Sequence, residues 1–220
     1  MRAMILAAGR GERMRHLTRE TPKPMLQAGG KPLIQYQVEN LVRSGITEII
    51  INHGIQGEQI ESWLGNGTQF GARIQYSAEG SVPLETGGGI LQALPLLGEE
   101  PFIVVNADIW TDYPYQQLPR ELPGQAHLVL VDNPAHHPHG DFYLRNSHVH
   151  NSGAGTLLTF SGIAVYSATL FADCRPGHFP LTPLLRAVVQ AGEVTGEHYQ
   201  GTWLDIGTPE RLSDLQTYLK

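Results

Sequence analysis

A glycine-rich, basic stretch directly behind an apolar run is the first part of this sequence that could do chemistry. The apolar residues at 3–6 have the pattern of a buried parallel strand, and Gly9 and Gly11 follow it closely. Because glycine has no Cβ, the main chain here can turn tightly and bring its N–H groups close to an anion. Arg13 and Lys23 can add full positive charge beside them. These residues predict a binding site for a polyphosphate.

A glycine-rich turn after a strand is weak evidence when it stands alone. The sequence at 9–11 is the first half of GxGxxG, but Met14 occupies the position of the third glycine. No GxxxxGK[ST] motif occurs either. Six of the fifteen Lys and Arg residues lie within positions 10–31, and a solvated charged loop would also explain this clustering. The interleaved Gly and Pro residues favour the binding site.

The continuation of this stretch makes it more specific. PKP at 22–24 and GGKPLI at 29–34 follow the glycines. Here the chain resembles the sugar-1-phosphate nucleotidyltransferases, whose signature has the form LAxGxGxRxxxLT, then PKP, then GxPLI. Further landmarks of that family occur in the same order, namely ETGG at 85–88, NAD at 106–108 and WLDIGTP at 203–209. The resemblance spans nearly the whole chain.

The resemblance implies a reaction in which a sugar-1-phosphate oxygen attacks the α-phosphorus of a nucleoside triphosphate and pyrophosphate leaves. Because two anions must meet, positioning and electrostatic screening should supply most of the acceleration, without a protein nucleophile. It assigns the phosphates to the backbone amides of Gly11, Glu12 and Arg13. Arg13 would hold the leaving pyrophosphate, and Lys23 the α-phosphate or the incoming phosphate. The alternatives are an ion-pair role for Arg13 and an exposed loop position for Lys23.

The same resemblance assigns a Mg²⁺ cofactor to Asp108 and Asp205. Each aspartate follows a short apolar run, so both can lie at the ends of strands. Mg²⁺ commonly takes one or two carboxylates and completes its shell with substrate phosphates and water, which makes a pair sufficient. A turn or N-cap position is the structural alternative for either residue.

The nucleoside and the sugar have less specific candidates. Gly88, in a second glycine-rich stretch, would let the main chain approach the nucleobase or ribose, although a helix start also explains the glycine. Asn106, beside the first metal aspartate, is a candidate for binding the sugar phosphate. Asp141 and Asn151 are further candidates, because they lie in the region that should cover the sugar.

Five histidines lie close together in the second half of the chain. A transition-metal site would need further ligands, and no Cys accompanies them, so exposed loop histidines are the better interpretation. The histidines are residues 136, 137, 139, 148 and 150. A strand–turn–serine elbow and an HExxH motif are both missing, which leaves hydrolase templates without support.

Apolar runs alternate with helical patterns, which is typical of a Rossmann-like, doubly wound and mostly parallel α/β sheet. Strands are predicted at 3–7, 48–52, 73–77 and 102–106, and β-like runs at 127–131, 141–145 and 157–166. Helices are predicted at 33–42, 58–64, 88–96 and 209–219. Open α/β sheets bind ligands at the carboxyl ends of their strands, so the glycine-rich loop and Asp108 should face each other.

We interpret residues 1–220 as a single nucleotidyltransferase domain of the GT-A-like type. Residues 1–112 would form the nucleotide-binding core. Pro, His and Asn become frequent from Tyr113 to Ser152, so residues 113–200 would form a small inserted sugar-binding β sub-domain and complete the sheet. Residues 201–220 would supply the metal aspartate and a C-terminal helix.

The composition of the chain limits the classes of molecule that it can bind. A net charge of −6 argues against broad binding to nucleic acid or to an anionic membrane. The apolar runs are short, and the amino terminus leads straight into a strand instead of a signal segment. The single cysteine, Cys174, agrees with a reducing compartment. We therefore expect a cytoplasmic protein that acts on small molecules, either as a monomer or as a small homo-oligomer.

Within the family, the NADI wording and the small size resemble most the members that use UTP and N-acetylmuramate 1-phosphate. The resemblance thus implies a Mg²⁺-dependent uridylyltransferase that makes UDP-N-acetylmuramate in peptidoglycan recycling. Mannose-1-phosphate guanylyltransferases, or other enzymes of the family, are the first alternative. A non-catalytic sensor of nucleotide sugars is the second alternative.

Overall fold

The apolar run that opens the chain forms β1 (Ala3–Leu6), a strand in the interior of a nine-stranded sheet. In the computed structural model, which describes residues 1–220, β1 pairs in parallel with β4 (Glu48–His53) and β6 (Phe102–Asn106). β5 (Arg73–Ala78) adds to β4, also in parallel. Each of these strands ends at the same edge of the sheet, where ligands of open α/β sheets bind.

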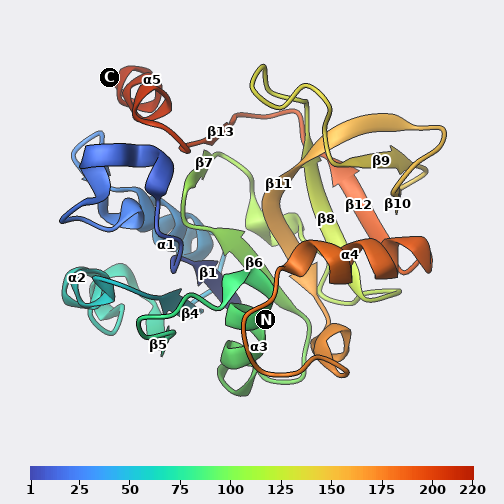
Figure 1. Cartoon of the computed structure of the whole chain (residues 1–220), viewed down its shortest axis with the longest axis horizontal. Helices are drawn as coiled ribbons and strands as arrows, with labels where there is room; N and C mark the ends of the chain where they lie inside the picture. Colours follow the sequence, from blue (N-terminus) through green and yellow to red (C-terminus); the bar gives the residue numbers. More distant parts are fainter.

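The second half of the chain extends the same sheet. β11 (Thr156–Tyr166) pairs antiparallel with β6 and with β8 (Ala126–Val131). β12 (Val194–His198) runs parallel to β8, and β10 (His148–His150) and β9 (Phe142–Arg145) complete the order β5-β4-β1-β6-β11-β8-β12-β10-β9. The predicted α/β class is confirmed, and the sheet is mixed because its second half is largely antiparallel (Figure 1).

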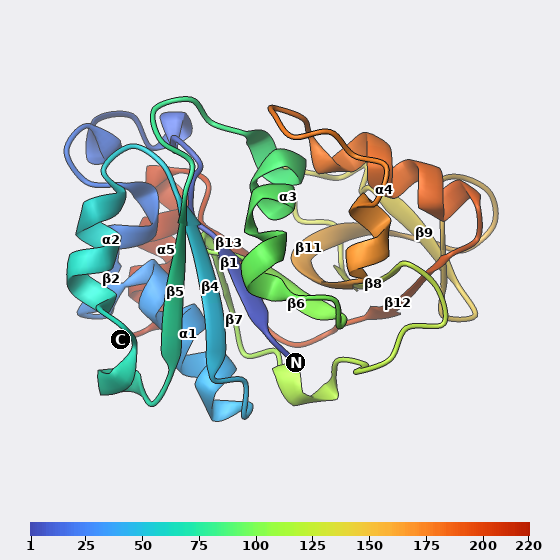
Figure 2. The ribbon, with the colours of Figure 1, turned by 90° about the horizontal axis from the view of Figure 1, so that it is seen from below.

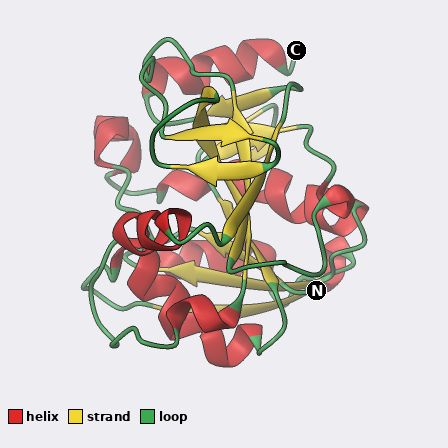
Figure 3. Cartoon of the chain, turned by 90° about the vertical axis from the view of Figure 1, so that its right-hand side faces the viewer, coloured by secondary structure: helices red, strands yellow, loops and turns green.

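Helices cover both faces of the sheet (Figures 2 and 3). α1 (Leu33–Arg43) and α2 (Gly57–Leu64) lie on one face. α3 (Glu85–Leu97) and α4 (Leu181–Gln190) lie on the other. α5 (Pro209–Tyr218) packs beside the 3₁₀ segments that follow β1, as Figure 1 shows at the upper left.

Alternation along β1 divides the apolar side chains between two cores. Ile5 packs in one core with Val38 of α1, and Met4 packs in the other with Ile90 of α3. All four side chains are fully buried, and each contributes about 1.5–3 kcal/mol by leaving water. A third, smaller cluster around Met14 holds α5 in place.

Short elements complete the chain and position the polar residues. β13 (Trp203–Asp205) pairs antiparallel with β7 (Ile109–Thr111), and β2 (Gln27–Ala28) pairs with β3 (Lys31–Pro32). The 3₁₀ helices are η1 (Glu12–Thr18), η2 (Lys23–Met25), η3 (Thr68–Phe70), η4 (Tyr115–Gln117) and η5 (Ala168–Phe171). No helix has the length and apolar character that crossing a membrane requires.

The predicted elements agree with the observed ones with few exceptions. β6 has the expected bounds. Each of the other predicted strands, and each of the helices α1, α2 and α5, differs from its predicted range by one residue at one end only. α3 starts at Glu85, three residues before the predicted start, so Gly88 lies within the helix. No sequence prediction covers α4 or the strands β2, β3, β7, β10, β12 and β13.

Candidate active site

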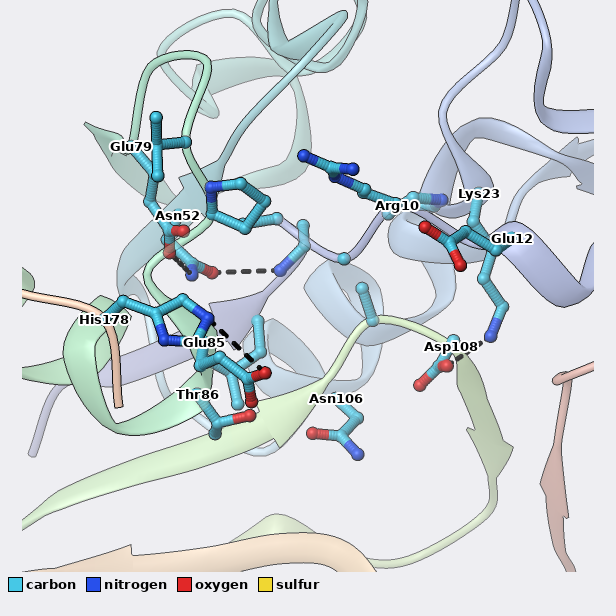
Figure 4. A pocket seen from close by; sticks show the side chains of 18 residues that line it. Arg10, Glu12, Lys23, Asn52, Glu79, Glu85, Thr86, Asn106, Asp108 and His178 are labelled. Carbon is cyan, nitrogen blue, oxygen red and sulfur yellow. Dashed lines mark hydrogen bonds and ion pairs between the residues drawn. The ribbon is translucent and has the colours of Figure 1, made fainter. Parts of the chain in front are cut away.

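A cavity of about 670 Å³ opens at the carboxyl ends of the four parallel strands. Residues within 6–12, 79–86 and 106–108 supply most of its wall, and each of these segments follows β1, β5 or β6. The glycine-rich loop and Asp108 therefore face the same space, as the sequence predicts. Figure 4 shows Lys23 and Asp108 at one end of this cavity and Glu79, Glu85 and His178 at the other.

The glycine-rich loop turns at Gly11, which has φ +63° and precedes η1. A Cβ on Gly11 would lie 2.9 Å from Cβ of Lys23, so a larger residue would displace the lysine as well as strain the backbone. The amides of Glu12 and Arg13 donate to no protein acceptor, as expected for the first N–H groups of a helical turn. The loop thus offers free donors beside the cavity, which Glu12 and Arg10 line.

Lys23 is held in place by the segment that contains it. Pro22 and Pro24 flank it, and the amide of Met25 donates to the carbonyl of Pro22 over 2.8 Å, which closes the η2 turn. The residue is only 7% exposed, and its Nζ forms an ion pair with a carboxylate oxygen of Asp108. A buried ammonium requires such a partner. Lys23 is therefore a positioned cation and not the exposed loop lysine of the alternative interpretation.

Asp108 and Asp205 converge although they lie 97 positions apart in the sequence. β13 lies along β7 with Asp205 opposite Ile109, and the amide of Ile206 donates to the carbonyl of Asp108 over 2.7 Å. Both aspartates line a second cavity of about 320 Å³. Asn106 and Asp108 line both cavities, so these two residues stand where the cavities meet.

The two aspartates fit a hard divalent cation. A third His, Cys, Asp or Glu does not join them in a ready-made metal cluster. Two carboxylates on one cavity nevertheless match a cation that completes its shell with phosphate oxygens and water. Asp205 is held by Arg211 and by Nε2 of His136, which lies 3.0 Å from its Oδ1. Each aspartate thus already faces positive charge before any ligand arrives.

A layer of tyrosines supports the strand that contains Asp205. Tyr199 donates its hydroxyl to Asp112, and Asp112 also accepts the amide of Thr202 over 2.8 Å, directly before β13. Burial, and then the charge of Asp112, raise the pKa of Tyr199 above its ordinary value, so the phenol remains a donor. Tyr113 packs edge-on against Tyr199, with ring centroids 5.0 Å apart. This layer fixes the approach of β13 to β7.

Asn106 and Arg13 both lie where a sugar phosphate could contact them. Gly162, with φ +81°, leaves room for Asn106, because a Cβ there would lie 2.5 Å from the Asn106 Nδ2. Arg13 is exposed and lines the second cavity beside Asp205. No acidic residue lies within ion-pair distance of Arg13, which leaves the structural ion pair without support.

The structure does not place Asp141 or Asn151 in either cavity. Oδ2 of Asp141 accepts the amide of Phe160 over 2.8 Å, and its Oδ1 lies 3.1 Å from Nε2 of His137. Asn151 exchanges hydrogen bonds with Arg186 of α4 over 2.9 and 3.2 Å. Both side chains thus have partners within the protein, and their direct contacts with the sugar stay predictions. Asp141 positions a cavity wall through Phe160, and Asn151 fastens β10 to α4.

Gly88 is also placed differently from the prediction. It is buried inside α3, and its amide donates to the carbonyl of Phe179 over 3.2 Å. A Cβ there would lie 2.1 Å from the carbonyl oxygen of Gly177, so the glycine allows close packing of two segments. Glu85 and Thr86, one turn earlier in the same helix, line the cavity in its place.

Sequence reasoning missed a polar network on the cavity wall. Oδ1 of Asn52 accepts the amide of Ala7 over 2.9 Å, and its Nδ2 donates to Glu79 over 2.6 Å. The other carboxylate oxygen of Glu79 accepts the amide of Leu84 over 2.9 Å. The network ties β1, β4 and the end of β5 together. The position of Asn52 at the carboxyl end of a predicted strand was a usable signal, whereas the contacts of Arg211 and His136 had none.

A model of the nucleotidyl transferase family matches residues 2–142 of the chain. The chain belongs to the nucleotidyl transferase family. It is 49% identical to an N-acetylmuramate α-1-phosphate uridylyltransferase from Neisseria meningitidis serogroup B, with 98% of this chain and 97% of the relative covered. It is 29% identical to mannose-1-phosphate guanyltransferase beta-A from Xenopus laevis, with coverage of 100% and 65%.

The fold of this nucleotidyl transferase is shared with solved structures of low sequence identity. One of them, from Bacillus anthracis, is assigned as a glucose-1-phosphate thymidylyltransferase and was solved in complex with a sucrose. It superimposes with a TM-score of 0.88 at 22% identity, with 100% of this chain and 95% of that chain covered. Nucleotidyl transferases of this family generally act with a divalent metal ion. The two aspartates described above are the residues of this chain that suit one.

Proposed function

We propose that this nucleotidyltransferase joins UTP and N-acetylmuramate 1-phosphate to form UDP-N-acetylmuramate and pyrophosphate, with Mg²⁺ as its cofactor. The meeting of two cavities at Asn106 and Asp108, between Lys23 and Asp205, is the observation that carries this proposal. One cavity, with a volume of about 670 Å³, is large enough for a nucleotide, and the other begins where the reacting phosphorus would lie. The near-full-length similarity to a uridylyltransferase supports the choice of substrates.

The sugar-phosphate oxygen would attack the α-phosphorus in line from the second cavity. The new bond joins that oxygen to the α-phosphorus, the bond from the α-phosphorus to the bridging oxygen breaks, and its electron pair leaves with pyrophosphate. Lys23 balances charge on the α-phosphate, and the free amides of the glycine-rich loop bind the other phosphates of the nucleotide. Arg13 lies on the second cavity beside Asp205, on the side of the incoming sugar phosphate. Mg²⁺ held by Asp108 and Asp205 would supply further neutralisation of phosphate charge.

The two cavities also suggest which part of the chain binds which substrate. The larger one is lined almost entirely by residues 1–112, and the smaller one adds residues from 113–200 and Asp205. We assign the triphosphate to the first part and the sugar to the second. Only small-molecule substrates are needed, and we place the reaction in the cytoplasm, in peptidoglycan recycling.

A pyrophosphate-release screen tests this proposal. The purified protein would be mixed with Mg²⁺ and each of four nucleoside triphosphates, crossed with the 1-phosphates of N-acetylmuramate, mannose, glucose and N-acetylglucosamine. We expect release with UTP and N-acetylmuramate 1-phosphate. Release confined to GTP and mannose 1-phosphate would replace the proposal with the guanylyltransferase, and no release in any combination would favour a sensor.

A pair of aspartate variants makes the screen specific for the metal site. Asp108→Asn should nearly abolish Mg²⁺-dependent release, because the amide is a weaker ligand for a hard cation. Asp214→Asn makes the same change on the exposed surface of α5, outside both cavities, and should leave release unchanged. Equal activity of the two variants would argue against a metal role for Asp108.

A further inference from the structure

Glu85 has a backbone conformation that its side chain does not favour. It is the first residue of α3 and has φ +62°, in the left-handed region that glycine adopts at lower cost. Its side chain nevertheless lies on the wall of the larger cavity. Strain of this kind is concentrated where a side chain has a function. A glycine would relieve the backbone, so the presence of glutamate calls for a role of its carboxylate.

The place of Glu85 in the cavity restricts what it can contact. If the reaction proceeds as proposed, the α-phosphate lies at Lys23 and Asp108, at the opposite end of the cavity (Figure 4). The nucleoside must then extend away from that end, toward Glu85 and Thr86. A carboxylate would repel phosphates but can accept hydrogen bonds from a neutral nucleoside. Glu85 therefore faces the part of the nucleotide that bears no charge.

Glu85 is the carboxylate at this end that has free oxygens. Both oxygens of Glu79 are already acceptors, one for Asn52 and the other for the amide of Leu84. Nε2 of His178 lies 3.6 Å from Oε1 of Glu85 and thus beyond hydrogen-bond distance. The Glu85 side chain is 48% exposed in the cavity mouth. It can accept two hydrogen bonds from a ligand without breaking any within the protein.

The ribose suits such a carboxylate better than the base does. An ionised carboxylate only accepts hydrogen bonds. The pairing edge of uracil places its single N–H between two carbonyl oxygens, which would repel a carboxylate. Adjacent hydroxyls on C2′ and C3′ of ribose instead present two donors side by side, and acidic residues bind ribose hydroxyls in other nucleotide sites.

We propose that the Glu85 carboxylate binds the ribose hydroxyls of the nucleoside triphosphate and so selects ribonucleotides over 2′-deoxyribonucleotides. This inference rests on the proposed function, because the orientation of the nucleotide comes from the position of the reacting phosphate. It adds a selectivity that base recognition alone would not provide.

The test compares UTP with dUTP in wild type, Glu85→Gln and Glu85→Gly. The ratio of kcat/KM for UTP to that for dUTP should be about tenfold or more in wild type, the size expected for a hydrogen bond to a charged group. It should approach one in Glu85→Gly, because UTP then loses the hydrogen bonds of both ribose hydroxyls, whereas dUTP, which keeps only the 3′-hydroxyl, loses one. Glu85→Gln should lie between them, because its amide keeps one acceptor oxygen. Calorimetric titration with each nucleotide should show the same order in Kd.

Ser147→Gly is the matched backbone control. Ser147 also has a positive φ, +60°, and lies in the turn between β9 and β10, outside both cavities. Both glycine variants should unfold at the same or a higher urea concentration than wild type, whereas only Glu85→Gly should change the nucleotide ratio. This separates a binding role from a purely conformational one.

Two results would overturn the inference. One is a wild-type UTP to dUTP ratio near one, and the other is an equal loss for both nucleotides in Glu85→Gly. Absence of pyrophosphate release by wild type with every substrate pair would instead refute the proposed function. In that case the calorimetric comparison of UTP with dUTP still decides whether Glu85 binds ribose.

Discussion

Lys23 and Asp108 neutralise each other in the absence of substrate, and the proposed reaction assigns both groups new partners. Lys23 is almost fully buried, whereas the Asp108 side chain is 35% exposed. Burial makes the ion pair necessary for the lysine, and the partial exposure leaves the carboxylate open to a second cation. If Asp108 binds the metal ion as proposed, lysine and metal compete for this carboxylate until phosphates bring additional negative charge to the site.

Replacing Lys23 with methionine should separate two effects of the lysine, namely its stabilisation of phosphate charge and its competition with the metal ion for Asp108. We expect turnover to fall by about two to three orders of magnitude, as for loss of one group that stabilises transition-state charge. Binding of Mg²⁺ to the protein without nucleotide should become tighter, because Asp108 loses its competing cation. Single-turnover kinetics and calorimetric titration with Mg²⁺ measure the two effects.

Lys31→Met is the control for this prediction. It removes a comparable ion pair, that of Lys31 with Glu39, which lies outside both cavities. It should alter neither turnover nor Mg²⁺ affinity. Weaker Mg²⁺ binding by Lys23→Met would contradict the competition between lysine and metal.

At the scale of elements, irregularities of the strands position the second cavity. β11 has a bulge between Phe160 and Ile163, where Oγ of Ser161 donates to the carbonyl of Val129 over 2.7 Å. The indole of Trp203 donates to the Ser161 carbonyl over 2.9 Å and ties β13 to this bulge. Bulges bend strands and redirect their side chains, often beside active sites. This bulge places Thr159–Ser161 on the wall of the second cavity.

The cap of α5 offers a test of how an element supports the proposed metal site. The hydroxyl of Thr208 accepts the amide of Arg211 over 3.4 Å at the start of the helix, and Arg211 in turn holds Asp205. Thr208→Ala should lower the free energy of unfolding by about 1 kcal/mol, measured by urea denaturation, and should weaken Mg²⁺ binding slightly. Thr208→Ser keeps the hydroxyl and should behave as wild type. Equal stability of all three proteins would show that the cap contributes nothing.

Elements with local signals were predictable from the sequence, and those that depend on distant pairing were not. The apolar run at 102–106 predicts β6, and Thr208 followed by Pro209 predicts the start of α5. In contrast, β12 (Val194–His198) contains one buried apolar residue, Val194, and exists because β8 pairs with it.

The candidate site divides in the same way. Lys23, Asp108 and Asp205 belong to recognisable motifs, and the structure brings them together. Asp141 and Asn151 were inferred from their region alone, and nothing in that region showed that their polar atoms bond to the protein itself. A residue within a motif has a defined place in the fold, whereas a residue chosen only by its region can direct its side chain toward either the ligand or the protein.

At the scale of the whole molecule, the continuous sheet buries an ionisable side chain, His127 of β8. Its Nδ1 pairs with the hydroxyl of Thr195 on the neighbouring strand β12 over 2.9 Å. Its Nε2 is buried and has no partner. Burial lowers the pKa of His127 below its ordinary value of 6.5, with Glu197 opposing in part. The folded protein therefore keeps this imidazole neutral where the unfolded chain protonates it.

This difference predicts a loss of stability on mild acidification. Above pH 6.5 both states hold His127 neutral, so its full contribution is present. As the pH falls below that value the unfolded chain takes up the proton first, and the free energy of unfolding declines until the folded pKa is passed. Urea denaturation between pH 7.5 and pH 5 should show a shallower decline for His127→Phe than for wild type. Parallel curves for the two proteins would refute the assignment to His127.

The pairing of β13 with β7 has a consequence for how the protein is made. During synthesis, residues 1–112 emerge from the ribosome long before Asp205 is added. The nascent chain can therefore complete the nucleotide-binding wall first. The carboxylate opposite Ile109 is still missing at that stage. If Asp205 holds the metal ion as proposed, a stop codon placed directly before it should leave the nucleotide-binding wall intact and yield a polypeptide that can bind nucleotide but cannot turn it over.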